Sequence, residues 1–377
     1  MLNSVAPGRY AHVVGWGSAV PERVLTNAEI ESFVETNDAW IRERTGICER
    51  RIASPDDDTV SLGTRAARRA LACADILPNQ VDLIITATST PARFFPATAN
   101  LIQDRLGATR AGAFDLLAAC TGFIYGLGLA AAQIRTGAIN TAVVIGTETL
   151  SRIVDWQDRN TCILFGDGAG AFVLTASEVP GGVLDVVLHS DGSGGDLLTC
   201  HTGMRSFWLE EEASRDAIHM SGREVFRFAS RVMVTATEEV LERCGLEPED
   251  VSLVVPHQAN IRIIEAAARG LKLPMEQFAV NIERYGNTST ASIPLAFEEA
   301  MQAERVHSND YVVLVGFGAG LTWGAAVIQW AARPTRAIQL RAILQESWYI
   351  LARVRSLFLR FLRFIGALIF RKSDTER

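Results

Sequence analysis

The chain has 377 residues, of which 48% are hydrophobic and 21% charged, the composition of a globular enzyme with one large or two smaller domains. Its formal net charge of −7 argues against general nucleic-acid binding, which requires a basic face. The charge is uneven. From Ala331 onward, ten basic and three acidic residues give +7, which leaves −14 for residues 1–330.

The N-terminus, "MLNSVAPGRY", has no basic segment followed by an apolar one, so no secretion signal is expected. The six cysteines lie far apart and form no C-x-x-C pair, which weakens zinc and redox-motif interpretations. Such sparse cysteine usage fits free thiols in a reducing cytoplasm. We therefore expect a cytoplasmic protein without a metal and without a resident cofactor.

Val- and Ile-rich runs alternate with Ala-rich helical stretches, which is typical of an α/β protein, and a faint internal repeat accompanies them. "LACADILPNQVDLIIT" (71–86) matches "LERCGLEPEDVSLVVP" (241–256) at an offset of 170, as a helix–loop–strand unit. The same offset relates 142–146 to 312–316, whereas 170–174 and 324–328 differ by 154. The first half should therefore carry extra residues between its last two strands.

The repeat predicts two pseudo-symmetric α/β halves, 1–179 and 180–331, each with one central helix, followed by an extension over 332–377. The first central helix contains 19 uncharged residues, 116–134, which is long enough to span a bilayer. Its Gly, Ala and Thr residues instead favour close helix contact inside the protein. We expect the second central helix after Asn287.

Three residues in these segments could carry chemistry. Cys120 precedes Gly122 near the expected start of the first central helix, where the helix dipole would lower the thiol pKa; a small core residue is the plain alternative. His257 follows a buried strand directly, at the edge where α/β sheets bind ligands. Asn287 lies in a glycine-led turn and has a plain alternative as a helix cap.

Together, "AACTGFIYGL", "VPHQANIRI" and "YGNTSTASIPLA" resemble the active-site motifs of the β-ketoacyl-ACP synthase III family, within the thiolase superfamily. Further matches are "NDAWIRERTGI", "FGDGAGAFVL" and "GFGAGLTWGAA", and the resemblance runs from about Gly8 to Ala331. It implies a five-layered αβαβα sandwich built from the two halves, and a homodimer.

The resemblance also implies a reaction. Cys120 would accept an acyl group from acyl-CoA, and decarboxylative Claisen condensation with malonyl-ACP would give 3-oxoacyl-ACP, as in fatty acid initiation. His257 and Asn287 would donate hydrogen bonds to the enolate, and the backbone amides of Cys120 and Ala319 would form an oxyanion hole. The family has glycine where Ala319 stands, which matters only if the loop needs a positive φ there.

Substrate-binding positions carry over from the same resemblance. Trp40, Arg44 and Arg159 would contact the CoA adenine and phosphates, with stacking and guanidinium–phosphate pairing. Asn260 would support the His257 loop. Arg262 and Arg269 would form a carrier-protein patch, although Gly270 replaces a lysine that is frequent in the family. The acyl pocket would be lined by Phe95, which would reach into the partner's site, and by Met220 and Phe317.

Three other classes of function share part of this pattern. A degradative thiolase would need a second catalytic cysteine late in the chain, and none follows Cys244. A polyketide-type ketosynthase with a non-acetyl primer shares the Cys-His-Asn set and remains an alternative. A non-catalytic acyl-binding subunit would have lost the nucleophile, which this chain keeps.

The extension has no counterpart in the family, whose members normally end near Ala331. At 100° per residue, its Arg residues and its Trp, Leu, Ile and Phe residues separate onto two sides of a helix, with Arg355 as the exception. This pattern is typical of a basic amphipathic helix at a membrane surface. Packing on the dimer or on a partner protein is the alternative, so residues 343–371 are expected to make one of these contacts.

Overall fold

The computed structural model describes residues 8–200, 217–331 and 339–373, without the side chains of 339–346, 366 and 368–373. Within these ranges the chain forms two large sheets and several helical layers. The first sheet has the order β1-β7-β6-β4-β5 and the second the order β8-β13-β12-β11. Smaller two-stranded sheets pair β2 with β3 and β9 with β10.

The first sheet is mixed: β4 runs parallel to β5 and β6, whereas β7 is antiparallel to both β6 and β1. In the second sheet, β11 is parallel to β12, and β13 is antiparallel to β12 and β8. Among the described residues, the second sheet has no full strand in the place that β5 takes in the first sheet. An isolated parallel bridge between Val254 and Phe278 stands there instead. The strand bounds are β1 (Tyr10–Ala19), β2 (Val24–Thr26), β3 (Glu49–Arg51), β4 (Leu83–Ala87), β5 (Gly112–Leu116), β6 (Thr141–Thr149), β7 (Asp167–Ser177), β8 (Gly182–Ser190), β9 (Leu198–Cys200), β10 (Ile218–Met220), β11 (Val251–Pro256), β12 (Tyr311–Gly318) and β13 (Thr322–Gln329).

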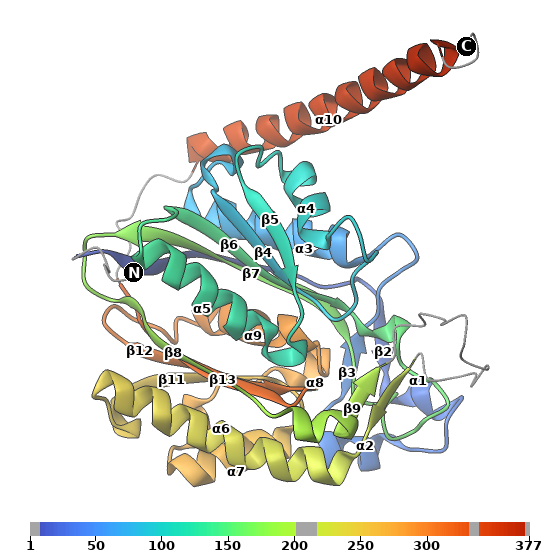
Figure 1. The fold of residues 1–377 in the computed structure, drawn as a ribbon. Coiled ribbons are helices and arrows are strands. Elements are labelled where there is room, and N and C mark those ends of the chain that lie inside the picture. Colours follow the sequence, from blue (N-terminus) through green and yellow to red (C-terminus); the bar gives the residue numbers. More distant parts are fainter. Residues whose placement is uncertain (1–7, 201–216, 332–338, 374–377) are drawn as a thin grey trace.

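Figure 1 shows how the helices cover the sheets. Helices α3 and α4 lie on the outer face of the first sheet, α6 and α7 on the outer face of the second, and α5 and α9 between the sheets. This is the αβαβα layering of a thiolase-like fold. The helix bounds are α1 (Asn27–Glu31), α2 (Asp38–Thr45), α3 (Thr59–Ala74), α4 (Thr98–Leu106), α5 (Gly122–Arg135), α6 (Gly222–Cys244), α7 (Ile261–Leu271), α8 (Ile282–Tyr285), α9 (Ser292–Gln302) and α10 (Gln339–Ser373).

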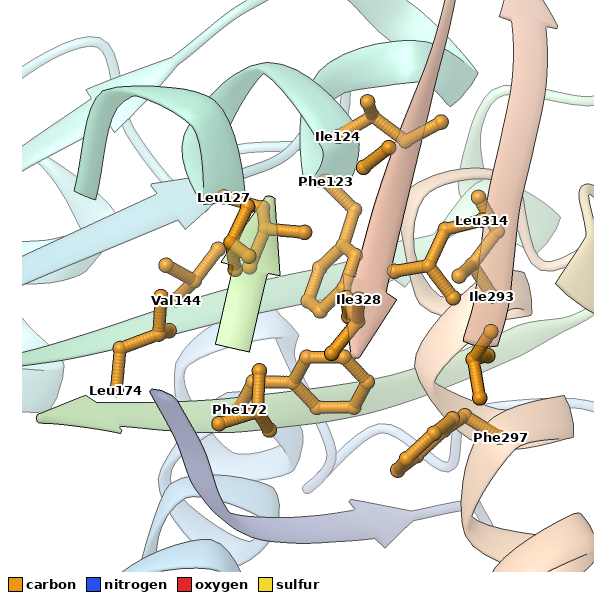
Figure 2. Packing of buried hydrophobic residues seen from close by; sticks show 14 of the residues in the cluster. Phe123, Ile124, Leu127, Val144, Phe172, Leu174, Ile293, Phe297, Leu314 and Ile328 are labelled. Atoms are coloured by element: carbon orange, nitrogen blue, oxygen red, sulfur yellow. The ribbon is translucent and has the colours of Figure 1, made fainter. Parts of the chain in front are cut away.

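The main core lies between the two sheets, around an aromatic chain that joins the halves (Figure 2). The Phe172 ring is 5.0 Å from the Phe123 ring of α5 and 4.8 Å from the Phe297 ring of α9, edge to face in both cases. In strands such as β6, the residues on both faces of the sheet are buried. The sequences of these strands are therefore continuous apolar runs. Most residues of α5 are buried as well, whereas Leu117 and Leu129 within the stretch 116–134 are exposed.

The predicted repeat is present in the structure. Helix α3, a short 3₁₀ turn and β4 recur as α6, a 3₁₀ turn and β11, and β6 recurs as β12. The extra residues predicted between the last two strands of the first half are 150–166, between β6 and β7, where β12 and β13 are joined by three residues.

After residue 331 the described chain resumes with α10, a 35-residue helix that leaves the body at one end (Figure 1). Of the segment 343–371, only the side chains of 347–365 and 367 are described. Across the described ranges, no helix combines the length and apolar character needed to cross a bilayer.

Candidate active site

Cys120 lies in a 3₁₀ turn, η2 (Ala119–Thr121), that leads directly into α5 at Gly122, so its expected place at a helix start is confirmed. The preceding residue, Ala119, has φ of 45°, a left-handed conformation that is unfavourable for a residue with a Cβ. The corresponding residue 170 positions later, Ser289, has φ of 49° in the matching turn η7 (Ser289–Ala291). Both halves therefore use the same strained turn before their central helix.

The electrostatics of Cys120 differ from the expectation. Burial raises the pKa of the thiol to about 12, and the neighbouring Glu148 raises it further, while a hydrogen bond with Ser289 opposes the shift. The predicted lowering by the helix start is therefore wrong for the unliganded site, because desolvation of the thiolate outweighs the helix dipole. The Cys120 side chain is therefore held as a neutral thiol.

His257 follows β11 and is 1% exposed. Its Nδ1 lies 2.6 Å from the Ser292 hydroxyl at the start of α9, and its Nε2 is buried without a hydrogen-bond partner among the described residues. The Phe317 ring packs against the imidazole at 5.3 Å. Burial lowers the pKa of His257 to about 3, so the ring is neutral at physiological pH and presents one nitrogen to the site.

The neutral burial of His257 predicts an acid-sensitive stability. The unfolded chain binds a proton near pH 6.5, whereas the folded chain binds it only near pH 3, so acid favours unfolding. Stability is full above pH 6.5 and falls as the pH drops toward 3, by about 3 kcal/mol at pH 4. Urea unfolding at pH 7 and pH 4 measures this loss. A His257→Gln variant should lose less, and an equal loss in both proteins would contradict the assignment.

Asn287 is held by its backbone and by its side-chain oxygen. Its N–H donates to the Leu164 carbonyl and its carbonyl accepts from the Gly166 N–H, which bridges the extra segment of the first half. Its Oδ1 accepts from the Ser289 amide at 2.8 Å. Because that oxygen is occupied, the Nδ2 amino group is the free donor of the side chain.

Behind Cys120 lies a buried carboxylate that the sequence patterns did not single out. Glu148, at the end of β6, accepts hydrogen bonds from the Thr90 hydroxyl at 2.7 Å, the Ser89 amide at 3.1 Å, and the Ser289 and Thr290 hydroxyls at 3.1 and 3.0 Å. Burial raises its pKa, and these hydrogen bonds oppose the shift. Glu148 thus ties η7 to the loop after β4, from opposite halves. Its only sequence signal was a charge at the end of an apolar strand.

The loop after β12 lies against the Cys120 turn. A Cβ added at Gly318 would lie 2.7 Å from the Cys120 backbone nitrogen. Thr322 connects the two segments: its Oγ1 is 3.0 Å from the Thr121 hydroxyl, 3.2 Å from the Ala118 carbonyl and 3.0 Å from the Ala319 carbonyl. Ala319 itself is not among the residues with positive φ, so its replacement of the family's glycine causes no backbone strain.

This close approach predicts a large effect of one methyl group. Gly318→Ala should push the Cys120 turn away and reduce acyl transfer at least about 100-fold, the scale of a 1 Å misplacement. Gly192→Ala is the matched control, because a Cβ there meets nothing within 4 Å. Acyl-enzyme formation by rapid-quench mass spectrometry compares the two, and similar rates would show that the Gly318 contact is unimportant.

One cavity of about 1090 Å³ unites these residues. Cys120, His257 and Asn287 all line it, although they come from η2, the end of β11 and the turn before η7. Phe317, Ala319, Met220 and Asn260 line it as well. The structure therefore places the three candidate catalytic side chains, both candidate oxyanion residues and three of the seven candidate binding residues around a single space.

The other binding candidates lie outside its lining. The Trp40 ring is flanked by two guanidinium groups, that of Arg159 at 4.8 Å and that of Arg44 at 5.6 Å. Asn260 joins this cluster to the cavity, because its Nδ2 donates to the Arg44 carbonyl and its Oδ1 caps α7 at the Arg262 amide. Phe95 is 86% exposed and does not line the cavity.

The candidate carrier-protein residues, Arg262 and Arg269, are both exposed and lie two turns apart on one face of α7. Gly270, which stands where a lysine is frequent in the family, has a steric explanation. A Cβ at this position would lie 2.5 Å from Val234 on α6. The neighbouring α6 adds exposed Arg223 and Arg227 at a spacing of four residues, which sequence reasoning missed. Their i, i+4 spacing on a helix was the signal that could have revealed them.

A five-layered αβαβα fold with a cysteine, a neutral histidine and an asparagine around one internal cavity defines the class of thiolase-like condensing enzymes. Comparison with known proteins narrows the class. Residues 114–192 match the family model "3-Oxoacyl-[acyl-carrier-protein (ACP)] synthase III", and residues 241–330 match the model of its C-terminal part. The chain belongs to the β-ketoacyl-[acyl-carrier-protein] synthase III family, and it is an acyltransferase.

Individual relatives agree with this assignment. The β-ketoacyl-[acyl-carrier-protein] synthase III of Roseiflexus sp. (strain RS-1) is 50% identical over 326 residues, which are 86% of this chain and 99% of that protein. The crystal structure of the enzyme from Aquifex aeolicus VF5 has a TM-score of 0.80 at 46% identity and covers 85% of this chain and 100% of its own. The priming β-ketosynthase of the R1128 polyketide pathway has a TM-score of 0.81 at 38% identity, covering 86% and 98%.

Proposed function

We propose that this acyltransferase moves an acyl group from acyl-CoA onto Cys120 and condenses it with malonyl-ACP, giving 3-oxoacyl-ACP and CO₂ as the first condensation of fatty acid synthesis. Residues 1–179 supply the nucleophile, and residues 180–331 supply His257 and Asn287. The observation that carries the proposal is the convergence of these three side chains on one cavity, in a chain of this family.

The first step is thioester exchange. The Cys120 sulfur attacks the acyl-CoA carbonyl, the bond between that carbonyl and the CoA sulfur breaks, and the thiol proton leaves with CoA. The backbone amides of Cys120 and Ala319 stabilise the oxyanion. The close approach of Gly318 to the Cys120 turn, which leaves no room for a Cβ, and the Thr322 hydrogen bonds keep these two segments in register.

The second step is decarboxylation of the malonyl group. Loss of CO₂ leaves an enolate on the malonyl thioester, and His257 Nε2–H and Asn287 Nδ2–H donate hydrogen bonds to its oxygen. The Ser292 hydroxyl lies 2.6 Å from Nδ1, and a hydrogen bond donated from it to Nδ1 would place the ring proton on Nε2. Ser289 supports the donor role of Asn287 by occupying the Asn287 oxygen. The enolate carbon then attacks the acyl-Cys120 carbonyl and releases the cysteine sulfur.

Substrate recognition follows the same layout. The Trp40 ring, with Arg44 and Arg159 over it, is suited to an adenine ring and phosphates. Met220 and Phe317, in the cavity lining, are suited to the acyl chain. The exposed arginines of α6 and α7 are suited to an acidic carrier protein, and comprise Arg223, Arg227, Arg262 and Arg269.

The enzyme is proposed to act as a cytoplasmic homodimer, and its sparse cysteine usage supports the compartment. Phe95 and Leu117 are 86% and 78% exposed, and β5 is an edge strand, so an apolar surface and an unpaired edge lie together. If a second subunit packed on this surface, Phe95 of each subunit would reach the active site of the other. The extension 343–371 is proposed to make an additional contact, with a membrane surface or a protein.

A specialised primer is the second candidate. It is favoured by the likeness to a polyketide priming β-ketosynthase, at 38% identity and a TM-score of 0.81. The catalytic steps would be unchanged, and only the acyl group that enters the cavity would differ.

Intact-mass spectrometry with a panel of acyl-CoAs tests both candidates. We expect each accepted primer to add its acyl mass once, at Cys120, and malonyl-ACP to discharge it with release of CO₂. Preference for acetyl-CoA supports fatty acid initiation, and preference for a longer or branched primer supports the second candidate. Absence of any acyl adduct would reject the proposed function.

A further inference from the structure

Helix α10 is attached to the outer face of the body by one side only. Tyr349 and Ala352 are buried against α3 and α4, and the Arg68 guanidinium lies 3.7 Å above the Tyr349 ring. Ser356 Oγ and Arg360 bond the Asp104 carboxylate at 2.7 and 3.0 Å. The side that docks on the body is therefore small, aromatic and polar.

The opposite side of α10 is apolar and uncovered. Its large hydrophobic side chains are 46–64% exposed, and at 100° per residue they span roughly 160° of the helix circumference. An a/d coiled-coil seam is narrower than this arc. The exposed residues are Ile350, Leu351, Val354, Leu357, Phe358, Phe361, Leu362 and Phe364.

The charges beside this apolar arc all have one sign. Arg353 follows one border and Arg355 follows the other, so the apparent exception in the sequence pattern lies at an edge of the arc. Arg360, beside Arg353, is bonded to Asp104 of the body. From Ser347 to Ser373 the helix contains no acidic residue. A second copy packed on the arc would bring like charges together, whereas arginine stems beside an apolar arc can reach anionic headgroups while the apolar groups enter the acyl region.

The position of the helix suits a surface contact. Residues 1–330 carry −14 and would be repelled by an anionic surface, whereas the chain from Ala331 onward carries +7. None of the described residues that line the cavity belongs to α3, α4 or α10. A surface that covers the apolar side of α10 would therefore leave the catalytic cavity accessible.

We propose that α10 lies in the headgroup interface of an anionic lipid bilayer through the apolar arc 350–364, with its arginines at the borders, and holds the acidic catalytic body at the membrane. The contact is peripheral, because the helix is attached to the body along one side and does not cross the bilayer.

Co-sedimentation of the full chain with phosphatidylcholine vesicles, with and without phosphatidylglycerol, tests this. We expect binding to the anionic vesicles, weakened at least about 10-fold by Phe358→Glu/Phe361→Glu. Arg353→Gln/Arg355→Gln should weaken binding about 10- to 30-fold, since each cation near an anionic surface contributes about one factor of five. Val179→Glu is the matched control, because Val179 is 61% exposed on the body.

Equal binding by the wild type and Phe358→Glu/Phe361→Glu, binding indifferent to phosphatidylglycerol, or no wild-type binding would each overturn the proposal. Sedimentation velocity without lipid gives a further check: if the glutamate variant forms a smaller assembly than the wild type, a second copy covers the arc and the proposal is wrong. Acylation by soluble acyl-CoA should be unchanged in all three variants, so a failure here is distinct from a failure of the proposed reaction.

Discussion

A Cys120→Ala enzyme takes up no acyl group from acyl-CoA, and its condensation rate falls at least about 10⁴-fold, the scale for loss of a covalent nucleophile. The reason is geometric as well as chemical. Among the described residues, Cys200 on β9 is the other cysteine that lines the cavity. Of these two, Cys120 lies in the turn η2, whose amide is proposed to hold the oxyanion. The measurement is intact mass after incubation with acyl-CoA, followed by peptide mapping.

Cys244→Ala is the control, since Cys244 is half-buried at the end of α6 and does not line the cavity. It should retain full acylation. Cys200→Ala separates the two cavity thiols and should also retain it. An acyl group recovered at Cys200, or undiminished labelling of Cys120→Ala, would refute the proposed nucleophile.

The second large effect is expected at Asn287. In Asn287→Asp the oxygen that accepts from the Ser289 amide is kept, so the turn should retain its shape, but the amino donor becomes an acceptor that repels the enolate. We expect condensation to fall at least about 10²- to 10³-fold, the effect of one lost oxyanion donor. Acyl transfer to Cys120 should be nearly unchanged, because the enolate forms only in the second step.

Single-turnover kinetics separate the two steps. The acyl-enzyme is formed first with acyl-CoA, and malonyl-ACP is then added while CO₂ release is followed. Asn287→Ala provides a comparison without the added charge and should lie between the wild type and Asn287→Asp. If Asn287→Asp slowed acylation as much as condensation, the residue would be structural and its assignment as an enolate donor would be incorrect.

The fold was predictable because the sequence contains an internal repeat. The repeat at an offset of 170 requires two similar helix–loop–strand units, and these are α3–β4 and α6–β11. Small residues in the central helices and apolar runs without alternation indicated burial on both sides. The shorter offset of 154 located the segment 150–166, whose end pairs with Asn287 through Phe165.

The positions of Cys120, His257 and Asn287 were also predictable, since each stands at the end of a recognisable strand or the start of a recognisable helix. Their electrostatics were not. The helix start indicated a lowered thiol pKa, whereas burial raises it to about 12. A local sequence pattern predicts a helix start and therefore its dipole. It does not predict how much of the surrounding protein excludes water from the Cys120 sulfur.

The hydrogen bonds that support the site could not be predicted from local patterns either, because they join residues that are far apart in the sequence. Glu148 collects hydrogen bonds from residues 58 to 142 positions away, and Thr322 reaches a turn 201 residues earlier. Likewise, Gly270 is explained by Val234 on another helix.

By itself, the sequence determined the internal repeat of helix–loop–strand units, the candidate residues Cys120, His257 and Asn287, and the separate basic extension, because periodicity, turn residues and charge are local properties. Tertiary structure decided which groups share a cavity, which side of α10 is covered, and how far each pKa moves. These depend on distances between residues remote in the chain and on the exclusion of water, and packing alone sets both.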